Sequence, residues 1–213
     1  MTFGSHEQDN DTANGKEPIE WLVLDYDEEN NSALLISRYG LDTKPYNTVP
    51  GEITWEKCLL RAWLNDDFLN EAFTDDERAA ILLTDVDDSK SQGYSGWSTD
   101  GGNNTEHKIF LLSCAEATRY FGVQIWEVHG SENNMDSRIV PTAYALSQGA
   151  GTLSGYTAAD GKASGWWWLR SPGMVEISVC LVYFDGSLQD FSADLSYSSI
   201  RPAFWIDLEA DLF

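Results

Sequence analysis

Cysteine, basic residues and long apolar runs are all scarce in this chain of 213 residues. Its three cysteines, Cys58, Cys114 and Cys180, are widely spaced and odd in number, which excludes a paired disulfide framework and a CxxC metal knuckle. We expect them to be small buried hydrophobes. No run approaches the ~18 apolar residues of a membrane-spanning helix, and no signal peptide is visible in the opening residues. We therefore expect no membrane insertion.

The shortage of positive charge narrows the range of partners. Lys and Arg total 13 against 35 Asp and Glu, which gives a formal charge of −22 at pH 7. A nucleic-acid backbone or an anionic membrane surface would repel such a chain. Hydrophobic residues make up 42% and aromatic residues 13% of the sequence, more than a disordered acidic chain carries. The length then predicts one folded domain over residues 1–213, with no nucleic-acid partner.

Motifs that carry catalysis or bind metals are missing as well. The histidines share no metal-ligand spacing: His6, His107 and His129. Three aspartates lack the spacing of a calcium-binding loop and are expected to form a solvated group: Asp85, Asp87 and Asp88. Ser171 does not lie in a GxSxG turn. The sequence thus predicts no catalytic residue, no metal site and no cofactor.

The spacing of apolar residues predicts a hairpin and a helix in the first third of the chain. Residues 19–40 form two apolar runs around an acidic, Asn-rich segment at residues 27–31, which predicts a β-hairpin. Residues 55–68 repeat apolar side chains three and four positions apart. This spacing predicts a helix, broken near Asn65.

The rest of the chain combines short helices with strands near its end. Two helix starts are indicated by capping-box spacing: Thr74 with Glu77, and Ser113 with Glu116. From Trp166 onward the pattern changes to apolar strands at residues 166–171, 178–184 and 199–207. Strands and helices without regular β-α-β alternation predict an α+β fold with an antiparallel sheet.

Two arginines stand out because each lies among apolar residues in a chain with few cations. Arg170 lies in WWWLRSPG and Arg201 in IRPAFW. A buried Arg needs a carboxylate or several carbonyl partners. We therefore expect both to form structural Arg–acid pairs, with ligand recognition as the alternative.

Several segments together resemble a known family over essentially the whole chain. They are TFGSHEQDN with NGKEPIEWLVLD, ALLISRYGLDTKPYN, ITWEKCLLRAWLNDDFLNEAF, KIFLLSCAEATRYF, WWLRSPG and RPAFWID. They appear in the order of an uncharacterised bacterial domain family common in gut-associated proteins. That family in turn is similar to the C-type-lectin-like superfold, which includes sugar-binding lectins, formylglycine-generating enzymes and the variable proteins of diversity-generating retroelements. The chain departs from the family at Ser199 and Ile200, where Gly-Val usually precedes RPA.

The active groups of two branches of the superfold are missing. Calcium-dependent lectins use EPN or QPD with WND, and neither set is present, since the WLND segment at residues 63–66 has an extra residue. Formylglycine-generating enzymes use two cysteines close together, whereas Cys180 has no near neighbour in the sequence. The His cluster of the related iron-dependent sulfoxide synthases is missing too. The resemblance therefore implies neither calcium-dependent sugar binding nor these reactions.

The third branch implies a varied binding surface at residues 174–200. In these retroelement systems, adenines in Asn-type codons are randomised, and the resulting codons encode a limited set of residue types. Between Val175 and Ile200, only Glu176 and Gln189 do not belong to that set. The segment FSADLSYSS mixes Tyr, Ser and Asp as antibody paratopes do. A buried strand accounts for VCLVYF equally well. Both interpretations stay open at this point.

We accordingly expect a non-enzymatic ligand-binding module with a C-type-lectin-like fold. Its expected ligand-binding residues are Val175, Ile177, Ser178, Leu181, Tyr183, Phe184, Asp190, Phe191, Asp194, Ser196, Tyr197 and Ser198. The expected framework residues of the hairpin are Val182, Gly186, Leu188 and Leu195. Such a surface requires that its aromatic side chains be at least partly exposed and replaceable.

The expected partner is a protein or a cell-surface ligand, and the cell surface, a phage or the secreted fraction is the favoured location. Two alternatives remain: a formylglycine-generating-enzyme-like oxidase with a rebuilt site, and a structural module of a surface protein.

Overall fold

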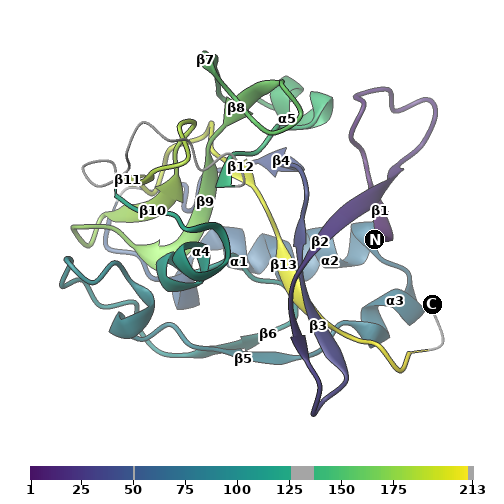
Figure 1. Ribbon diagram of the computed structural model, residues 1–213, viewed down its shortest axis with the longest axis horizontal. Coiled ribbons are helices and arrows are strands. Elements are labelled where there is room, and N and C mark those ends of the chain that lie inside the picture. Colours follow the sequence, from purple (N-terminus) through teal and green to yellow (C-terminus); the bar gives the residue numbers. More distant parts are fainter. Residues whose placement is uncertain (50, 126–136, 211–213) are drawn as a thin grey trace.

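Two main sheets lie side by side with short helices around them (Figure 1). The computed structural model describes residues 1–49, 51–125 and 137–210. The first sheet has the order β1 (Thr2–His6), β2 (Glu17–Asp27), β3 (Ser32–Ser37) and β13 (Ala203–Asp207). The second has the order β11 (Leu188–Ser192), β10 (Ser178–Val182), β9 (Trp167–Pro172), β12 (Ser199–Ile200) and β4 (Asp42–Thr43).

Smaller elements surround these sheets. Two ribbons pair β5 (Thr84–Val86) with β6 (Thr105–His107), and β7 (Thr152–Thr157) with β8 (Ala163–Gly165). The helices are α1 (Leu59–Trp63), α2 (Leu69–Ala72), α3 (Asp75–Ala80), α4 (Cys114–Phe121) and α5 (Ala143–Ser147). The strand pairs are antiparallel apart from β9 and β12, which run parallel. This arrangement is compatible with the α+β class that the sequence predicts.

The predicted hairpin is confirmed and belongs to the first sheet. β2 and β3 pair antiparallel around a turn in which Asn31 adopts a positive φ of 44°. The last strand, β13, pairs with the other edge of β3. Every residue of β3 is buried as a result. The aromatic core beside this sheet includes Trp21, whose ring centroid lies 4.6 Å from that of Phe204.

Local sequence signals set the helix starts. Both predicted capping boxes are present, at Thr74 with Glu77 and at Ser113 with Glu116. The predicted break near Asn65 is wrong, because the chain passes through one π-helical turn there and stays helical into α2. The Asn65 side chain links this turn to Ile109, since its amide donates to the Ile109 carbonyl at 2.8 Å and its oxygen accepts from Ile109 N at 2.9 Å.

Arg170 forms the expected buried ion pair. Its Nε lies 2.9 Å from Asp88 Oδ1, and both of its terminal nitrogens contact the Glu116 carboxylate. The side chains of Arg170 and Asp88 are each 2% exposed. Asp88 is therefore not part of a solvated acidic group, and that expectation is corrected: its carboxylate is the counter-ion of a buried arginine.

The prediction that Arg201 forms a pair with an acidic side chain is wrong. The residue is 1% exposed, and its Nε donates to the Ser37 carbonyl at 2.8 Å. Among the described residues no carboxylate pairs with it, and its Nη1 has no hydrogen-bond partner. The guanidinium instead lies over two rings, 4.7 Å from the centroid of Phe121 and 4.9 Å from that of Trp167. Aromatic faces take the place of the acid.

Candidate functional site

The turn between β10 and β11 begins with two aromatic residues, Tyr183 and Phe184. Tyr183 packs against the hydrophobic core from a half-buried position. Asp185 Oδ1 accepts hydrogen bonds from the backbone and hydroxyl of Ser187, and Gly186 supplies a φ of 88°. Tyr183 N donates to the Ser187 carbonyl at 2.8 Å, which closes the turn. Tyr183 and Phe184 are consequently half-buried at its start, while the neighbouring Gly186 and Ser187 are buried.

Trp166, immediately before β9, is the centre of an aromatic cluster at this end of the sheet. Its ring centroid lies 4.6 Å from those of Tyr183 and Tyr197, 5.5 Å from that of Phe191 and 6.0 Å from that of Phe184. The rings of Tyr183 and Phe191 stack at 5.8 Å. The edge-to-face geometries are those that aromatic pairs prefer. Residues that are distant in the sequence thus form one continuous surface.

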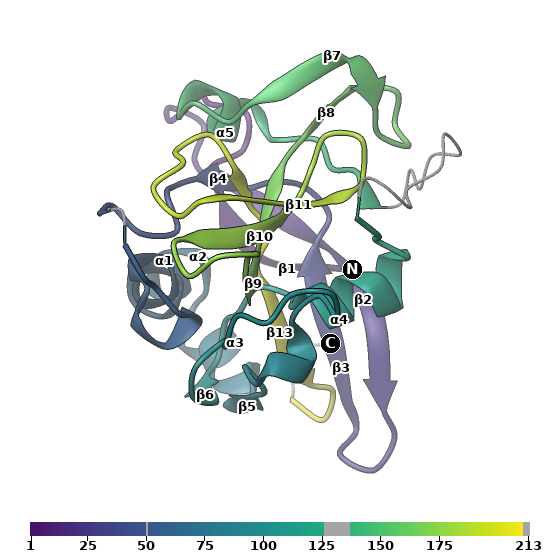
Figure 2. The same cartoon turned by 90° about the vertical axis from the view of Figure 1, so that its left-hand side faces the viewer.

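β7 extends this surface to a second ribbon. The ring of Tyr156 lies 4.7 Å from that of Phe184, and Figure 2 shows β7 and β8 beside the β10–β11 hairpin. We call these residues the Trp166 cluster: Tyr156, Trp166, Tyr183, Phe184, Phe191 and Tyr197. Tyr197 is 36% exposed and the others are half-buried. The expected partial exposure of the four predicted aromatic residues is therefore confirmed.

The chemistry of the Trp166 cluster is that of a contact surface. The Tyr183 hydroxyl is protonated near neutral pH and able to donate, and burial raises its pKa further. The exposed side chains of Asp194 and Ser196 lie close along the chain and add polar groups. Large rings with hydroxyl and carboxylate groups at their border provide apolar contact area together with hydrogen-bonding groups.

Several predicted ligand-binding residues lie elsewhere, and three are buried. Leu181 is fully buried in β10 because both faces of this strand are covered, and Ser178 and Ser198 are buried too. Val175 and Ile177 are 53% and 50% exposed, but they lie in the loop before β10. That loop is at the opposite end of β10 from Tyr183, since six residues of extended chain, about 20 Å, separate Ile177 from Tyr183.

Asp190 also has a structural role instead of facing a ligand. Its Oδ2 accepts from Ser178 Oγ and from Met174 N at 2.9 Å, which fixes the loop before β10. Of the framework residues, Val182, Gly186 and Leu188 are buried and Leu195 is half-buried, as their role requires. Trp166 and Tyr156 were missed as site residues. Trp166 could have been found from the sequence, because successive side chains of a strand point to opposite faces and Trp166 is therefore separated from Trp167. No signal in the sequence places Tyr156 beside Phe184.

The cysteines are buried and free, and two of them lie together. Cys58, Cys114 and Cys180 are at most 2% exposed. Burial and the nearby Cys114 thiol raise the pKa of Cys180 well above its ordinary value. The absence of a neighbour for Cys180 holds only along the sequence, since Cys114 adjoins it in space. Cys114 also lines a cavity of about 480 Å³ together with Tyr94. Protonated thiols are poor nucleophiles.

Metal ligands are few in the described part of the chain. The single group of three suitable side chains there comprises Glu7, Asp9 and Glu17, whose ligand atoms lie within 4.8 Å of one another. One of its oxygens, Glu17 Oε2, already accepts from Gln8 N at 2.6 Å. His6 and His107 are buried in separate places, and His129 lies outside the described residues. Of these three side chains, Asp9 is exposed, Glu17 is half-buried and Glu7 is buried.

The comparisons with known proteins give a family and no relative of known activity. A family model described as a domain of unknown function (DUF6273) matches residues 30–208. No curated protein and no solved structure matches the chain. None of the helices in residues 1–49, 51–125 and 137–210 has the length and apolar character needed to cross a membrane.

Proposed function

The chain belongs to this family of domains of unknown function, and we propose that it is a non-enzymatic binding module whose ligand surface is the Trp166 cluster. The observation that carries the proposal is the contact of four half-exposed rings with Trp166 at one end of the second sheet. Aromatic side chains supply large contact area at low entropy cost, and they dominate the energetics of interfaces.

A protein or cell-surface ligand fits this surface better than a small molecule. The cluster is formed by stacked side chains on a hairpin and a ribbon, which is an arrangement suited to a broad contact. Asp194 and Asp185 border it, and the whole chain carries a charge of −22. Electrostatic complementarity therefore favours a basic partner surface, and such attraction speeds association.

We propose further that the hairpin is a varied surface on a C-type-lectin-like frame, as in the variable proteins of diversity-generating retroelements. This proposal is supported by the alternation of buried and half-exposed side chains in residues 182–197. Val182, Gly186 and Leu188 are buried and hold the hairpin, while Tyr183, Phe184 and Phe191 are half-exposed. A near-duplicate of the coding segment for residues 167–204, differing only at adenines, is expected near the gene. Its absence there would remove the retroelement part and leave the binding module.

A display experiment tests the binding module. A library with Tyr183, Phe184, Phe191 and Tyr197 varied is selected for binding to a cationic lysozyme. We expect folded members to be enriched. A matched library varied at the exposed loop residues Met174, Val175 and Ile177 is expected to yield no binder that depends on those positions. If the first library gives no folded binder, the Trp166 cluster is core, and a purely structural module becomes the better interpretation.

A second candidate is the oxidase with a rebuilt site, and it is favoured by one observation. Cys114 adjoins Cys180 and also lines a cavity. Two sulfurs are a donor set that Cu(I) accepts. The raised pKa of Cys180 opposes metal binding, because a ligating thiol must lose its proton. Copper or iron bound stoichiometrically by the purified protein, and lost in Cys114→Ser, would favour the enzyme over the binding module.

A further inference from the structure

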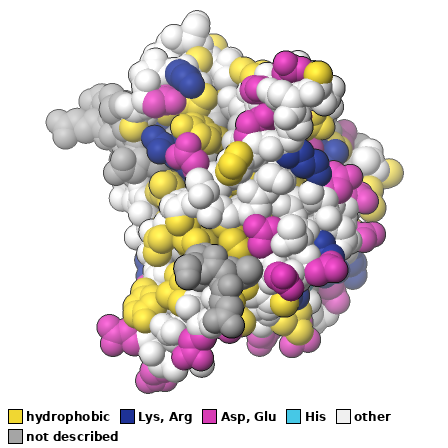
Figure 3. All heavy atoms as spheres, turned by 90° about the vertical axis from the view of Figure 1, so that its right-hand side faces the viewer, with side chains coloured by type: hydrophobic (Ala, Val, Ile, Leu, Met, Phe, Trp, Pro, Cys, Tyr) yellow, Lys and Arg dark blue, Asp and Glu magenta, His cyan; other side chains and the backbone are white. Residues whose placement is uncertain are grey.

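A cavity of about 580 Å³ lies apart from the Trp166 cluster, between β2, the end of α4 and the segment after β7. Its apolar walls include Leu24, Tyr120, Ile139, Val140 and Ala158, and its basic groups are Arg38, Arg138 and Arg201. On the side of the molecule drawn in Figure 3, basic side chains are few and acidic ones are spread widely. A cavity lined by three arginines is therefore unusual for this chain.

The other charged groups that line the cavity already have hydrogen-bond or ion-pair partners. Arg38 forms an exposed ion pair with Glu20 at 2.9 Å. Asp160, the acidic group of the lining, lies 4.0 Å from Lys162. Arg138 donates to the carbonyls of Asp185 and Thr157 at 3.1 and 3.0 Å. None of these groups needs an added ligand.

Arg201 differs from them because it is a buried cation without a counter-ion. Arg170 has the same depth of burial and holds two carboxylates, whereas no carboxylate in the described part of the chain reaches Arg201. One terminal nitrogen has no partner at all. Burial lowers the pKa of Arg201 to about 9, which still leaves it charged at pH 7. An unpaired buried charge costs free energy unless something completes its contacts.

The surroundings hold the guanidinium in a fixed orientation. The rings of Phe121 and Trp167 lie within 5 Å of its central carbon, and Ser37 O accepts from Nε. A guanidinium whose Nη1 has no partner matches a carboxylate, which accepts strong charge-assisted hydrogen bonds from arginine. The volume falls within the range of small-molecule sites, and the walls are mainly apolar. The overall charge of −22 repels a multiply charged polyphosphate more strongly than a singly charged carboxylate.

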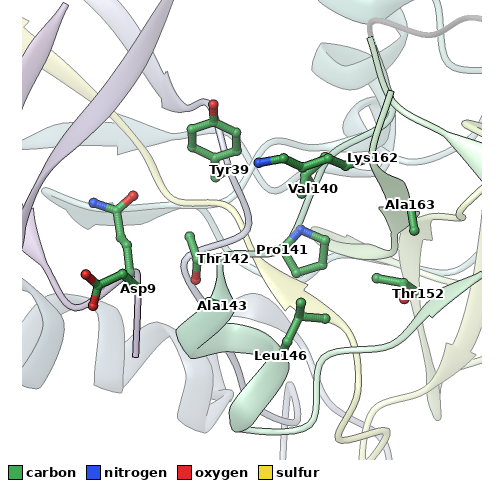
Figure 4. Close-up of a pocket in the computed structure, with 11 residues that line it drawn as sticks. Asp9, Tyr39, Val140, Pro141, Thr142, Ala143, Leu146, Thr152, Lys162 and Ala163 are labelled. Carbon is green, nitrogen blue, oxygen red and sulfur yellow. The ribbon is translucent and has the colours of Figure 1, made fainter. Parts of the chain in front are cut away.

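We propose that this cavity binds a small organic monocarboxylate with an apolar body, whose carboxylate pairs with Arg201. The apolar body would lie against Leu24, Tyr120 and Ile139. The adjoining cavity of about 490 Å³ shares Tyr39 and Val140 with this one and gives room for a longer body. Figure 4 shows the amino end of Lys162 directed towards Tyr39 across that second cavity. This inference is independent of the proposed function of the Trp166 cluster.

The test uses the full chain and three related probes. Benzoate, neutral benzamide and inorganic phosphate are titrated by calorimetry at 0.15 M salt, with melting temperature as a second readout. We expect benzoate to bind at least ten-fold more tightly than benzamide or phosphate and to raise the melting temperature. Equal binding of benzoate and benzamide would overturn the role of charge. Phosphate binding as tight as that of benzoate would overturn the carboxylate assignment, and absence of benzoate binding would overturn the site.

Variants connect binding to the cavity. Arg201→Met is expected to lose benzoate binding at least ten-fold. Because Arg201→Met could unfold the domain, Ala159→Glu provides a second route: Ala159 is exposed, lines the cavity and can carry a carboxylate that repels the probe. Ala159→Gln is the matched neutral control and should bind as the parent does. Unchanged binding in Ala159→Glu would contradict the proposal even if Arg201→Met cannot be purified.

Discussion

Replacement of Arg170 by Met tests how much the buried ion pair contributes to stability. The change removes the partner of Asp88 Oδ1 and both contacts of Glu116, and Asp88 would keep only the Thr105 hydroxyl, 2.7 Å from its Oδ2. Breaking a buried pair on one side costs about 3–5 kcal/mol, because an uncompensated charge stays buried. Glu116 is 28% exposed and regains water, so most of the loss comes from Asp88. We expect a loss of ~3 kcal/mol.

The assay is urea unfolding at pH 7.5, followed by tryptophan fluorescence. The control is Arg38→Met, which removes an exposed pair whose side chains are 48% and 47% exposed and should cost ~0–1 kcal/mol. Burial already raises the pKa of Asp88, and the loss of Arg170 would raise it further. The deficit should therefore shrink at pH 5, as Asp88 takes up a proton, and in the double variant with Asp88→Asn. If Arg170→Met costs no more than Arg38→Met, the ion pair is not a stabilising element and this reasoning fails.

Three other predictions concern acid stability, the Trp166 cluster and calcium. Burial lowers the pKa of His6 and His107 from 6.5 to about 4. The unfolded chain therefore binds their protons first, and stability should fall from pH 7 towards pH 4 by up to ~3 kcal/mol for each group. Urea midpoints across that range should show this slope, reduced in the double variant His6→Gln/His107→Gln, and an unchanged slope would contradict it. Changing Tyr183, Phe184, Phe191 and Tyr197 together to Ser should lower stability by ~1 kcal/mol for each ring or less yet leave a cooperative transition, whereas Trp21→Ser or Trp168→Ser should abolish folding. A non-cooperative melt of the four-fold variant would mean that these rings are core. Millimolar calcium should raise the melting temperature no more than equimolar magnesium does, and a selective calcium effect of more than a few degrees would reveal a specific site.

Local features of the fold follow from the sequence because their causes are local. The capping box at Ser113 and Glu116 depends on residues three apart, and it forms as predicted. The turn before β3 likewise depends on a short acidic, Asn-rich segment. The continued helix at Asn65 involves a contact that is not local, since the Asn65 side chain exchanges two hydrogen bonds with Ile109, from a distant part of the chain.

The candidate sites depend on contacts that the sequence does not encode locally. Leu181 is buried because elements on both faces cover β10, so alternation along that strand gives no information on exposure. Arg170 and Arg201 occupy similar apolar contexts, yet one meets Asp88 and the other meets two aromatic rings. Which partner each arginine finds is decided by tertiary packing, and a pattern of neighbouring residues does not contain that information.

The pairing of β3 with β13 has a consequence for biosynthesis. Ile36 of β3 pairs with Ala203 of β13. The apolar edge of β3 therefore stays unpaired until ~170 further residues have been synthesised, which takes roughly 10–35 s at ribosomal rates. Contacts this distant in sequence also slow folding. An unpaired strand edge is a template for association with other chains. The nascent β2–β3 hairpin is thus the segment on which chaperones should act most, and translation pauses between the codons of residues 37 and 203 would lengthen its exposure.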